Sequence, residues 1–304
     1  MTISTQVRNT EVSDIKTTDR EQWVIRRRFG GSQDALAQTN SWVAPIIRRV
    51  VDGARIKPGD EILDVGSRDR LMALEAFSRL GDSGRLTMAE LSDGLVRRLS
   101  EMVRERGIEQ RCRVITFSPA PLAGLPDESI DAATMRSALA YMGDPVSALE
   151  EVRRVLRPGA RFSIIQMFGE AEVALDGHYF MGYDVSPIPQ LMQALAVRAP
   201  AVVTDSDVPP FDERDVVRWF ERAGFKNFDL SFELEAADSS SWPPPDWELA
   251  IDMAGAPGSP TLREIMASAF SRDERAEFEA CLRPQVEAGR RRVRFRRAYV
   301  VAVK

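Results

Sequence analysis

Arg68 and Arg70 lie in a short turn between an apolar strand and a helix, at positions where a nucleotide-binding turn carries glycine. Residues 61–66 (EILDVG) predict a buried strand that ends in a glycine, and residues 71–80 predict the helix that follows. Glycines in such a turn let the backbone approach a ligand, because they have no Cβ. Gly66 keeps the first glycine position, whereas the two arginines put long cationic side chains at the others. The spacing therefore predicts a ligand site that is either reshaped or closed.

His178, the only histidine, is a second candidate for chemistry, with Tyr183 and Asp184 close after it in the chain. Histidine titrates near neutral pH, so His178 can act as an acid or a base, and a nearby tyrosine can assist. The alternative is that His178 is a surface or hinge residue. Both interpretations stay open at this point.

Three polar residues, Arg136, Ser137 and Tyr141, follow the strand predicted over residues 130–135. In a parallel α/β sheet the ligand lies beyond the carboxyl ends of the strands, so these side chains are candidates for substrate contact. The alternative is that they only form the loop and the start of the next helix.

The composition limits the class of protein. The chain has 304 residues, of which 44% are hydrophobic and 29% charged, with a net charge of -5. A negative net charge argues against nucleic acid as the main partner. The arginines of residues 290–297 alternate with apolar side chains and predict a strand with one solvated face. Only Cys112 and Cys281 are present, without the spacing of a metal site, and no apolar stretch predicts a signal peptide or a membrane span. We expect a cytoplasmic protein without a bound metal.

The order of predicted elements indicates an α/β fold. Strands and helices alternate from residue 34 to about 168, which favours a parallel sheet with helices on both faces. We expect one domain over residues 21–304, after a disordered tail at 1–20. Two insertions, 169–208 and 237–290, interrupt the alternation, and such insertions commonly form lids over a ligand.

Five stretches together resemble the class I S-adenosylmethionine-dependent methyltransferases, close to the UbiE-like small-molecule group. They are residues 62–66, Glu90 and residues 125–131, 149–159 and 219–225. The resemblance implies a Rossmann-like fold with a seven-stranded, mostly parallel sheet and an antiparallel last strand. It also implies that Gly66 lies at the methyl donor and that Glu90 binds the ribose hydroxyls of the donor. Alternatively, Glu90 caps the following helix.

The chain departs from the family pattern at Arg68 and Arg70, which replace glycines, and at Pro119, which replaces the acid that binds adenine. Proline has neither an N–H nor a carboxylate, so we expect S-adenosylmethionine to bind weakly or not at all. Some relatives in bacterial secondary metabolism keep the fold and act as cyclases or pericyclases. The resemblance implies this class of enzymes, which also includes hydroxylases, and no particular reaction. From the altered donor site we expect an enzyme that needs no cofactor and closes a ring in a natural-product intermediate.

The site residues expected from these arguments fall into three groups. The catalytic candidates are His178, Tyr183 and Arg136, and the vestigial donor site is Gly66 and Glu90. The substrate-binding candidates are Arg68, Arg70, Ser137, Tyr141 and Trp23. Trp23 lies in an N-terminal segment that often covers the pocket in the family. Two alternatives remain: an active methyltransferase that binds S-adenosylmethionine in a modified pocket, and a pseudoenzyme that supports a partner protein. The expected partner is a small-molecule substrate, with a homodimer or a small partner protein left open.

Overall fold

The computed structural model describes most of the chain. The described residues are 23–28, 30, 33–68, 70–117, 122, 124–168, 178–199, 211–237, 246–255 and 258–304. The predicted tail at 1–20, Pro119 and parts of both predicted insertions lie outside the described residues.

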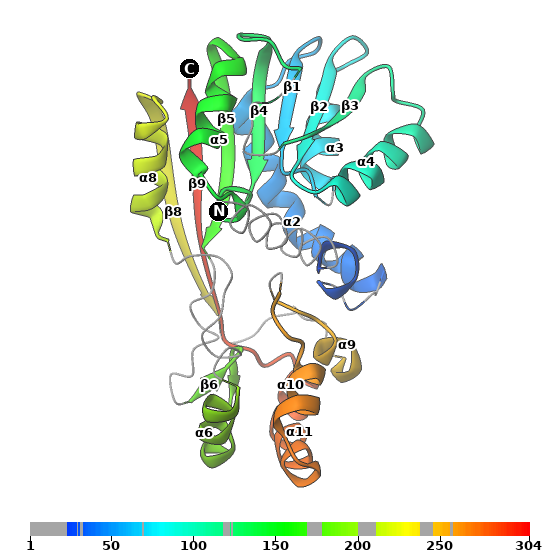
Figure 1. Ribbon diagram of the computed structural model, residues 1–304, viewed down its shortest axis with the longest axis vertical. Helices are drawn as coiled ribbons and strands as arrows, with labels where there is room; N and C mark the ends of the chain where they lie inside the picture. Colours follow the sequence, from blue (N-terminus) through cyan, green and yellow to red (C-terminus); the bar gives the residue numbers. More distant parts are fainter. Residues whose placement is uncertain are drawn as a thin grey trace, which may run out of the picture. The chain divides into compact units, whose positions relative to one another are not determined.

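A seven-stranded sheet has the order β3-β2-β1-β4-β5-β9-β8 (Figure 1). Its strands are β1 (Glu61–Val65), β2 (Arg85–Glu90), β3 (Cys112–Thr116), β4 (Ile130–Arg136), β5 (Leu156–Phe168), β8 (Asn227–Ala237) and β9 (Val293–Val303). The strands from β1 to β5 pair in parallel, and β9 runs in the opposite direction to its neighbours. The predicted Rossmann-like fold with a mostly parallel seven-stranded sheet is therefore confirmed.

Helices cover both faces of this sheet. They are α2 (Gln33–Ala54), α3 (Leu71–Ser78), α4 (Asp93–Glu105), α5 (Pro145–Val155) and α8 (Glu213–Arg222), with a short 3-10 helix at Leu139–Tyr141. Apolar residues of α5 and α8 form one core with β1, β4, β5 and β9, and those of α2, α3 and α4 pack on the opposite face. The first core is rich in aromatic rings: the centroid of Phe220 lies 6.0 Å from that of Phe162 and 5.3 Å from that of Phe225. These apolar contacts fix where the strands end.

The start of β5 is irregular. Pro158 and Gly159 are residue types that commonly stop a helix before a strand begins, but β5 already begins at Leu156 and includes both. The register shifts here, because Ile130 pairs with Leu156 and Ala132 pairs with Arg161. Proline and glycine are tolerated at such an irregularity, where a ladder hydrogen bond is already missing.

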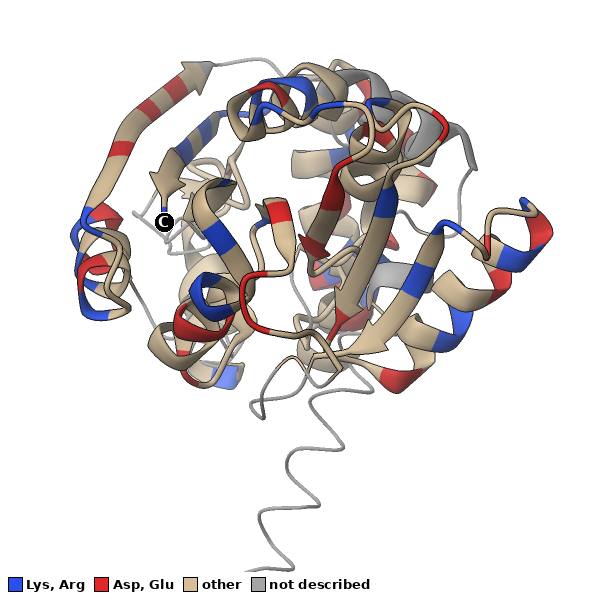
Figure 2. Ribbon diagram, turned by 90° about the horizontal axis from the view of Figure 1, so that it is seen from above, with Lys and Arg blue, Asp and Glu red and all other residues tan. Residues whose placement is uncertain are grey.

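The arginine-rich end of the chain pairs with an acidic strand. Figure 2 shows basic positions along β9 beside acidic positions along β8. Glu233 of β8 accepts a hydrogen bond of 2.9 Å from Arg297 and also pairs with Arg49 of α2, and these contacts lower the pKa of Glu233. The guanidinium of Arg49 lies 3.6 Å from the ring centroid of Tyr299. Part of the arginine cluster therefore holds β9 to β8 and α2.

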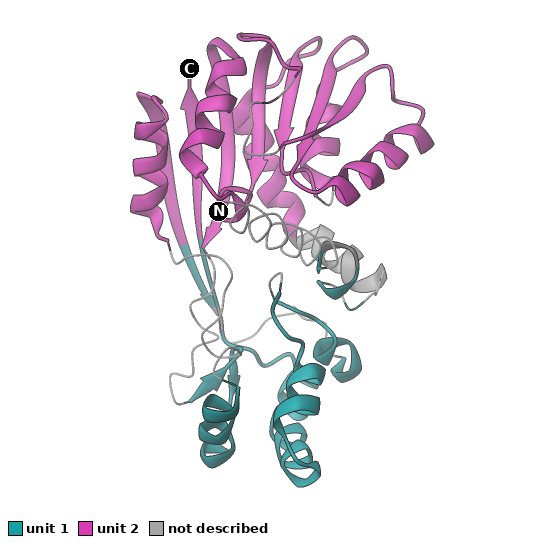
Figure 3. Ribbon diagram, viewed as in Figure 1, with its two compact units in different colours: residues 1–39, 169–210, 234–296 teal, residues 40–168, 211–233, 297–304 magenta. Residues whose placement is uncertain are grey.

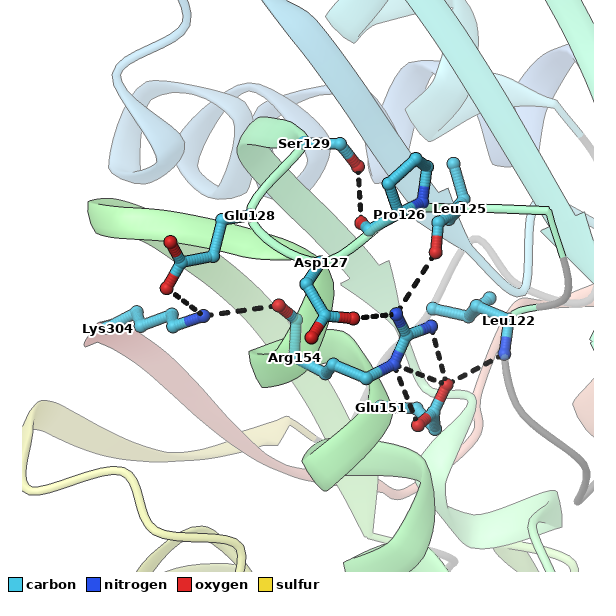
Figure 4. A network of polar contacts seen from close by, with 9 residues as sticks. All are labelled: Leu122, Leu125, Pro126, Asp127, Glu128, Ser129, Glu151, Arg154 and Lys304. Carbon is cyan, nitrogen blue, oxygen red and sulfur yellow. Dashed lines mark hydrogen bonds and ion pairs between the residues drawn. The ribbon is translucent and has the colours of Figure 1, made fainter.

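A second polar network joins two of the stretches on which the family resemblance rests (Figure 4). Arg154 of α5 donates to Asp127 at 2.5 Å and to the carbonyl oxygen of Leu125 at 3.1 Å. It also donates to Glu151, which accepts from the backbone N–H of Leu122 at 2.9 Å. The network ties the segment before β4 to α5, so these family motifs have a structural role.

The chain folds into two compact units, each described here by itself (Figure 3). Unit 2 holds residues 40–168, 211–233 and 297–304, and unit 1 holds residues 1–39, 169–210 and 234–296. The described elements of unit 1 include a π-helix (Trp23–Arg27), β6 (Tyr179–Phe180), β7 (Tyr183–Asp184), α6 (Pro189–Arg198), α9 (Trp247–Ile251), α10 (Leu262–Ala269) and α11 (Arg272–Glu287).

Unit 1 has a hydrophobic core of its own. Phe180 and Phe278 are fully buried in it, and their ring centroids lie 6.2 Å apart. Both predicted insertions fall in unit 1, together with the N-terminal segment. Their function as lids stays a prediction.

Candidate functional site

The carboxyl ends of β1, β2, β4 and β5 meet at one edge of unit 2, and the turn after β1 lies there. Gly66 has φ +73°, which favours glycine, and its N–H donates to the carbonyl oxygen of Ala89 at the end of β2. A Cβ added to Gly66 would lie 2.7 Å from the Cβ of Ala138, which follows β4. Packing alone therefore requires glycine at this position.

Buried hydrogen bonds hold the start of this turn. Asp64 is only 1% exposed, and it accepts from the hydroxyl of Thr134 at 2.6 Å and from the hydroxyl of Ser67 at 2.7 Å. The carboxylate links β1 to β4 and to the turn. These contacts give Asp64 a structural role.

Arg68 turns inward rather than toward water. It is 5% exposed, and its Nη2 donates to the carbonyl oxygen of Arg136 at 2.9 Å. Its guanidinium carbon lies 5.5 Å from the ring centroid of Tyr141. Its Nε is buried without a hydrogen-bond partner among the described residues. A cationic side chain from the turn after β1 is therefore directed toward the end of β4.

Glu90 is fully buried at the end of β2, and backbone amides use both of its oxygens. Oε2 accepts from the N–H of Arg68 at 2.9 Å, and Oε1 accepts from the N–H of Leu91 at 2.7 Å. The side-chain cap of α4 is Ser92, which accepts from the N–H of Leu95. The alternative that Glu90 caps the following helix is therefore wrong, because Ser92 has that role.

The loop after β4 carries the other predicted residues of this edge. Ser137 has φ +49°, which is unusual for a residue with a side chain, and its N–H donates to the carbonyl oxygen of Ile165. Arg136 is 8% exposed, and Tyr141 ends the 3-10 helix. Arg70 is half-buried and also has a positive φ, +60°. Unusual backbone conformations of this kind gather at functional sites.

Gln166 of β5 was missed from the sequence. It is fully buried, its Nε2 donates to the carbonyl oxygen of Met167 at 2.7 Å, and its Oε1 has no partner among the described residues. Arg136 pairs with Ile165 in the register of β4 and β5, so Gln166 lies next to Ser137. The feature of the sequence that could have identified Gln166 is its position as a single amide side chain in the apolar end of β5.

Unit 2 thus brings together seven of the ten predicted site residues. The turn after β1 carries Gly66, Arg68 and Arg70; β2 ends in Glu90; and β4 with its following loop carries Arg136, Ser137 and Tyr141. Contacts among them join Arg68 to Glu90, Arg136 and Tyr141.

The other three predicted residues, His178, Tyr183 and Trp23, belong to unit 1. The Nδ1 of His178, which is exposed, lies 3.3 Å from the hydroxyl of Ser186. Tyr183 is 4% exposed in the core of unit 1, and burial raises the pKa of its hydroxyl. Trp23 is buried and donates from Nε1 to the carbonyl oxygen of Ala254 at 2.7 Å. Their predicted roles at the reacting centre stay predictions.

In the part of the chain that the structure describes, no group of His, Cys, Asp and Glu side chains could hold a metal ion. None of the helices among these residues is both long and apolar enough to span a bilayer.

Comparison with known proteins identifies the family of unit 2. Residues 63–164 match the model of the Methyltransferase domain family, Methyltransf_11. The UbiE C-methyltransferase of ubiquinone and menaquinone biosynthesis from Bdellovibrio bacteriovorus is 27% identical over 146 residues, which cover 47% of this chain and 59% of that protein. The chain therefore contains a class I S-adenosylmethionine-dependent methyltransferase domain and is a distant homologue of UbiE. The alignment spans less than two thirds of that relative's length.

Solved structures agree with this fold. The MccD protein superposes with a TM-score of 0.50 at 13% identity, covering 92% of this chain and 100% of that chain. The 4+2 cyclase SpnF superposes with a TM-score of 0.47 at 16% identity, covering 86% of this chain and 80% of that chain. At this identity the first likeness concerns the fold alone, and the second, with a TM-score below 0.5, supports no argument about fold or reaction.

Proposed function

We propose that the protein is an enzyme of small-molecule metabolism that transfers a methyl group from S-adenosylmethionine, bound in a pocket that is modified at the turn after β1. The observation that carries the proposal is Glu90, a fully buried carboxylate at the end of β2 and beside the Gly66 turn. The homology to methyltransferases supports it, because members of this family typically use this donor.

The residues present fit the donor in part. A carboxylate has about four acceptor sites on its two oxygens. Accepting from two backbone amides does not by itself prevent the Glu90 carboxylate from also accepting from ribose hydroxyls. The Arg68 guanidinium does not fit beside the donor's sulfonium, because two buried cations repel each other. It fits the donor's carboxylate instead.

The remaining residues of the edge have roles that follow from their positions. S-adenosylmethionine, when bound, supplies an electrophilic methyl group. Arg136, Ser137 and Tyr141 lie beside the turn and are the proposed contacts of a small organic substrate. The acid or base role predicted for His178, with assistance from Tyr183, stays a proposal that rests on the sequence alone. A second copy of the chain or a small partner protein stays an expectation.

A second candidate function is favoured by the inward position of Arg68. With its guanidinium bonded to the carbonyl oxygen of Arg136, this residue occupies part of the edge at which a donor would lie. An enzyme of secondary metabolism that closes a ring in a bound intermediate needs no donor, since positioning alone can supply about 7–11 kcal/mol of a barrier in favourable cases. This second candidate function requires no cofactor.

Calorimetric titration with S-adenosylmethionine and S-adenosylhomocysteine separates the two candidates. The methyltransferase proposal expects micromolar binding to the unaltered protein. Glu90→Gln should weaken binding about tenfold or more, because a charge-assisted hydrogen bond to the ribose is lost. Glu105→Gln, at an exposed position on α4, is the matched control and should bind as the unaltered protein does.

The absence of binding at millimolar donor would overturn the methyltransferase proposal and favour the donor-independent reaction. If the donor binds, transfer of a labelled methyl group to simple quinols and phenols gives the first test of the substrate class. Thermal unfolding of Glu90→Gln must accompany the titration, because Glu90 also accepts from two backbone amides.

A further inference from the structure

Arg68 is a buried cation for which the described residues supply no anionic partner. Its side chain is 95% removed from solvent, yet its recorded side-chain contacts are one hydrogen bond to a neutral carbonyl oxygen and one aromatic ring. In the described part of the chain, no carboxylate lies within ion-pair distance of its guanidinium. Glu90 meets Arg68 only through the backbone N–H. Burying a charge in this way is unfavourable unless a counter-charge is present.

The orientation of the guanidinium is fixed, and one of its donors is left over. The hydrogen bond from Nη2 to Arg136 and the ring of Tyr141 constrain the plane of the group. Nε, on the edge that an oxyanion approaches in a two-point contact, is buried and has no partner among the described residues. The Arg68 guanidinium therefore has both an unused hydrogen-bond donor and no counter-charge among the described residues.

The surrounding backbone also departs from its relaxed state. Arg70 and Ser137 flank Arg68 in the turn and at the end of β4, and both have positive φ values, +60° and +49°. Each costs about 1–2 kcal/mol in a residue with a side chain. A turn that served only to join β1 to α3 would relax more cheaply. The conformation instead keeps the Arg68 side chain directed into the edge.

We propose that Arg68 is the receptor for an anionic group, a carboxylate or a phosphate, of a ligand bound at the carboxyl edge of the sheet. The anion accepts hydrogen bonds from the Arg68 guanidinium, with Nε as the donor that is free to take it. The inference relies on the proposed function only for placing a ligand at this edge. It holds whether the anion belongs to the donor's carboxylate or to the substrate.

Arg68→Met tests the proposal, because methionine is similar in length and removes both the charge and the donors. Arg113→Met is the matched control, since Arg113 on β3 is exposed and its Nε donates to Thr87. Thermal unfolding is measured with and without millimolar pyrophosphate at constant ionic strength. Binding of S-adenosylhomocysteine and of methylthioadenosine, which lacks the carboxylate, is measured by calorimetry.

The proposal expects a selective loss of anion binding in Arg68→Met. If the anion is the donor's carboxylate, S-adenosylhomocysteine should bind about tenfold or more weakly, and methylthioadenosine should bind equally to both proteins. If the anion belongs to the substrate, pyrophosphate should raise the melting temperature of the unaltered protein and of Arg113→Met, but not of Arg68→Met. The second result supports the inference even if the protein binds no donor.

Equal responses of Arg68→Met and the unaltered protein to pyrophosphate and to both nucleosides would overturn the proposal. Arg68→Lys keeps the charge but not the planar group with Nε, so it should fold and retain part of the anion response. If Arg68→Met does not fold, the anion response of Arg68→Lys tests the proposal instead. A response to the anions equal to that of the unaltered protein would refute the role of Nε.

Discussion

Replacing Gly66 with alanine should destabilise unit 2 far more than an ordinary change from glycine to alanine. The left-handed φ of +73° costs alanine about 1–2 kcal/mol. The new Cβ would also lie 2.7 Å from the Cβ of Ala138, well inside the ~3.5–4 Å of a normal carbon–carbon contact. Overpacking of this kind costs about 1–3 kcal/mol. The free energy of unfolding should therefore fall by about 2–5 kcal/mol.

Gly107→Ala isolates the backbone contribution. Gly107 has φ +64° and nothing within 4 Å of an added Cβ, so its substitution should cost only about 1–2 kcal/mol. Ala138→Gly isolates the clash, because adding it to Gly66→Ala removes the overlapping methyl group. The double-mutant cycle should give a favourable coupling of about 1–3 kcal/mol.

Hydrogen exchange in increasing urea, followed on peptides that cover β1 and β4, measures these free energies in unit 2 alone. The choice of assay matters because the chain has two compact units, which need not unfold together. If Gly66→Ala were no more destabilising than Gly107→Ala, or if Ala138→Gly gave no rescue, packing would not be the reason for glycine at residue 66.

Two further predictions concern ionisable groups. Hydrogen bonds from Arg154 lower the pKa of Glu151 below its ordinary value of 4.5, so this contribution to stability is present at neutral pH and is lost as the pH falls through the lowered pKa. Glu151→Gln should therefore lower the free energy of unfolding by about 1–3 kcal/mol at pH 7 and by almost nothing in strong acid. Urea titrations at a series of pH values measure this free energy for both proteins. A difference between the two proteins that stays constant from pH 7 to acid would contradict the prediction. Burial raises the pKa of Cys112 to about 11. Iodoacetamide at pH 8 should therefore modify the half-buried Cys281 first and Cys112 only in urea, which peptide mass spectrometry can measure. Equal rates of modification of the two cysteines in the folded protein would contradict this prediction.

The fold followed from the sequence because its local signals agree with one another. Apolar runs at regular spacing predicted the strands. Ser92 is of a residue type that commonly begins a helix, and its side chain accepts from the N–H of Leu95 at the start of α4. Parallel strands place their carboxyl ends at one edge, so the grouping of Glu90 with Arg136 was also predictable. The start of β5 was not, because Pro158 and Gly159 end a helix by local rules, while the register shift against β4 depends on the partner strand.

The direction of side chains could not be read from the sequence. Arg68 and Arg70 looked equivalent in the turn, but Arg68 is buried and Arg70 is only half-buried. The difference arises from the carbonyl oxygen of Arg136 and the ring of Tyr141, which the fold brings to Arg68 from a distant part of the chain. Gln166 was missed for the same reason, since its unpartnered oxygen is visible only once the neighbouring groups are placed.

The two family residues that the chain retains do not by themselves decide its reaction. Gly66 is required by its φ and by Ala138, and Glu90 accepts from two backbone amides, so a protein that binds no donor would need both. The presence of Gly66 and Glu90 is therefore weaker evidence for methyl transfer than their match to the family motif suggests. Arg68 is more informative about the ligand, because the described residues offer no counter-charge for its guanidinium. We propose a ligand as the partner of this buried cation, and the chemistry of that ligand will distinguish methyl transfer from a reaction without a donor.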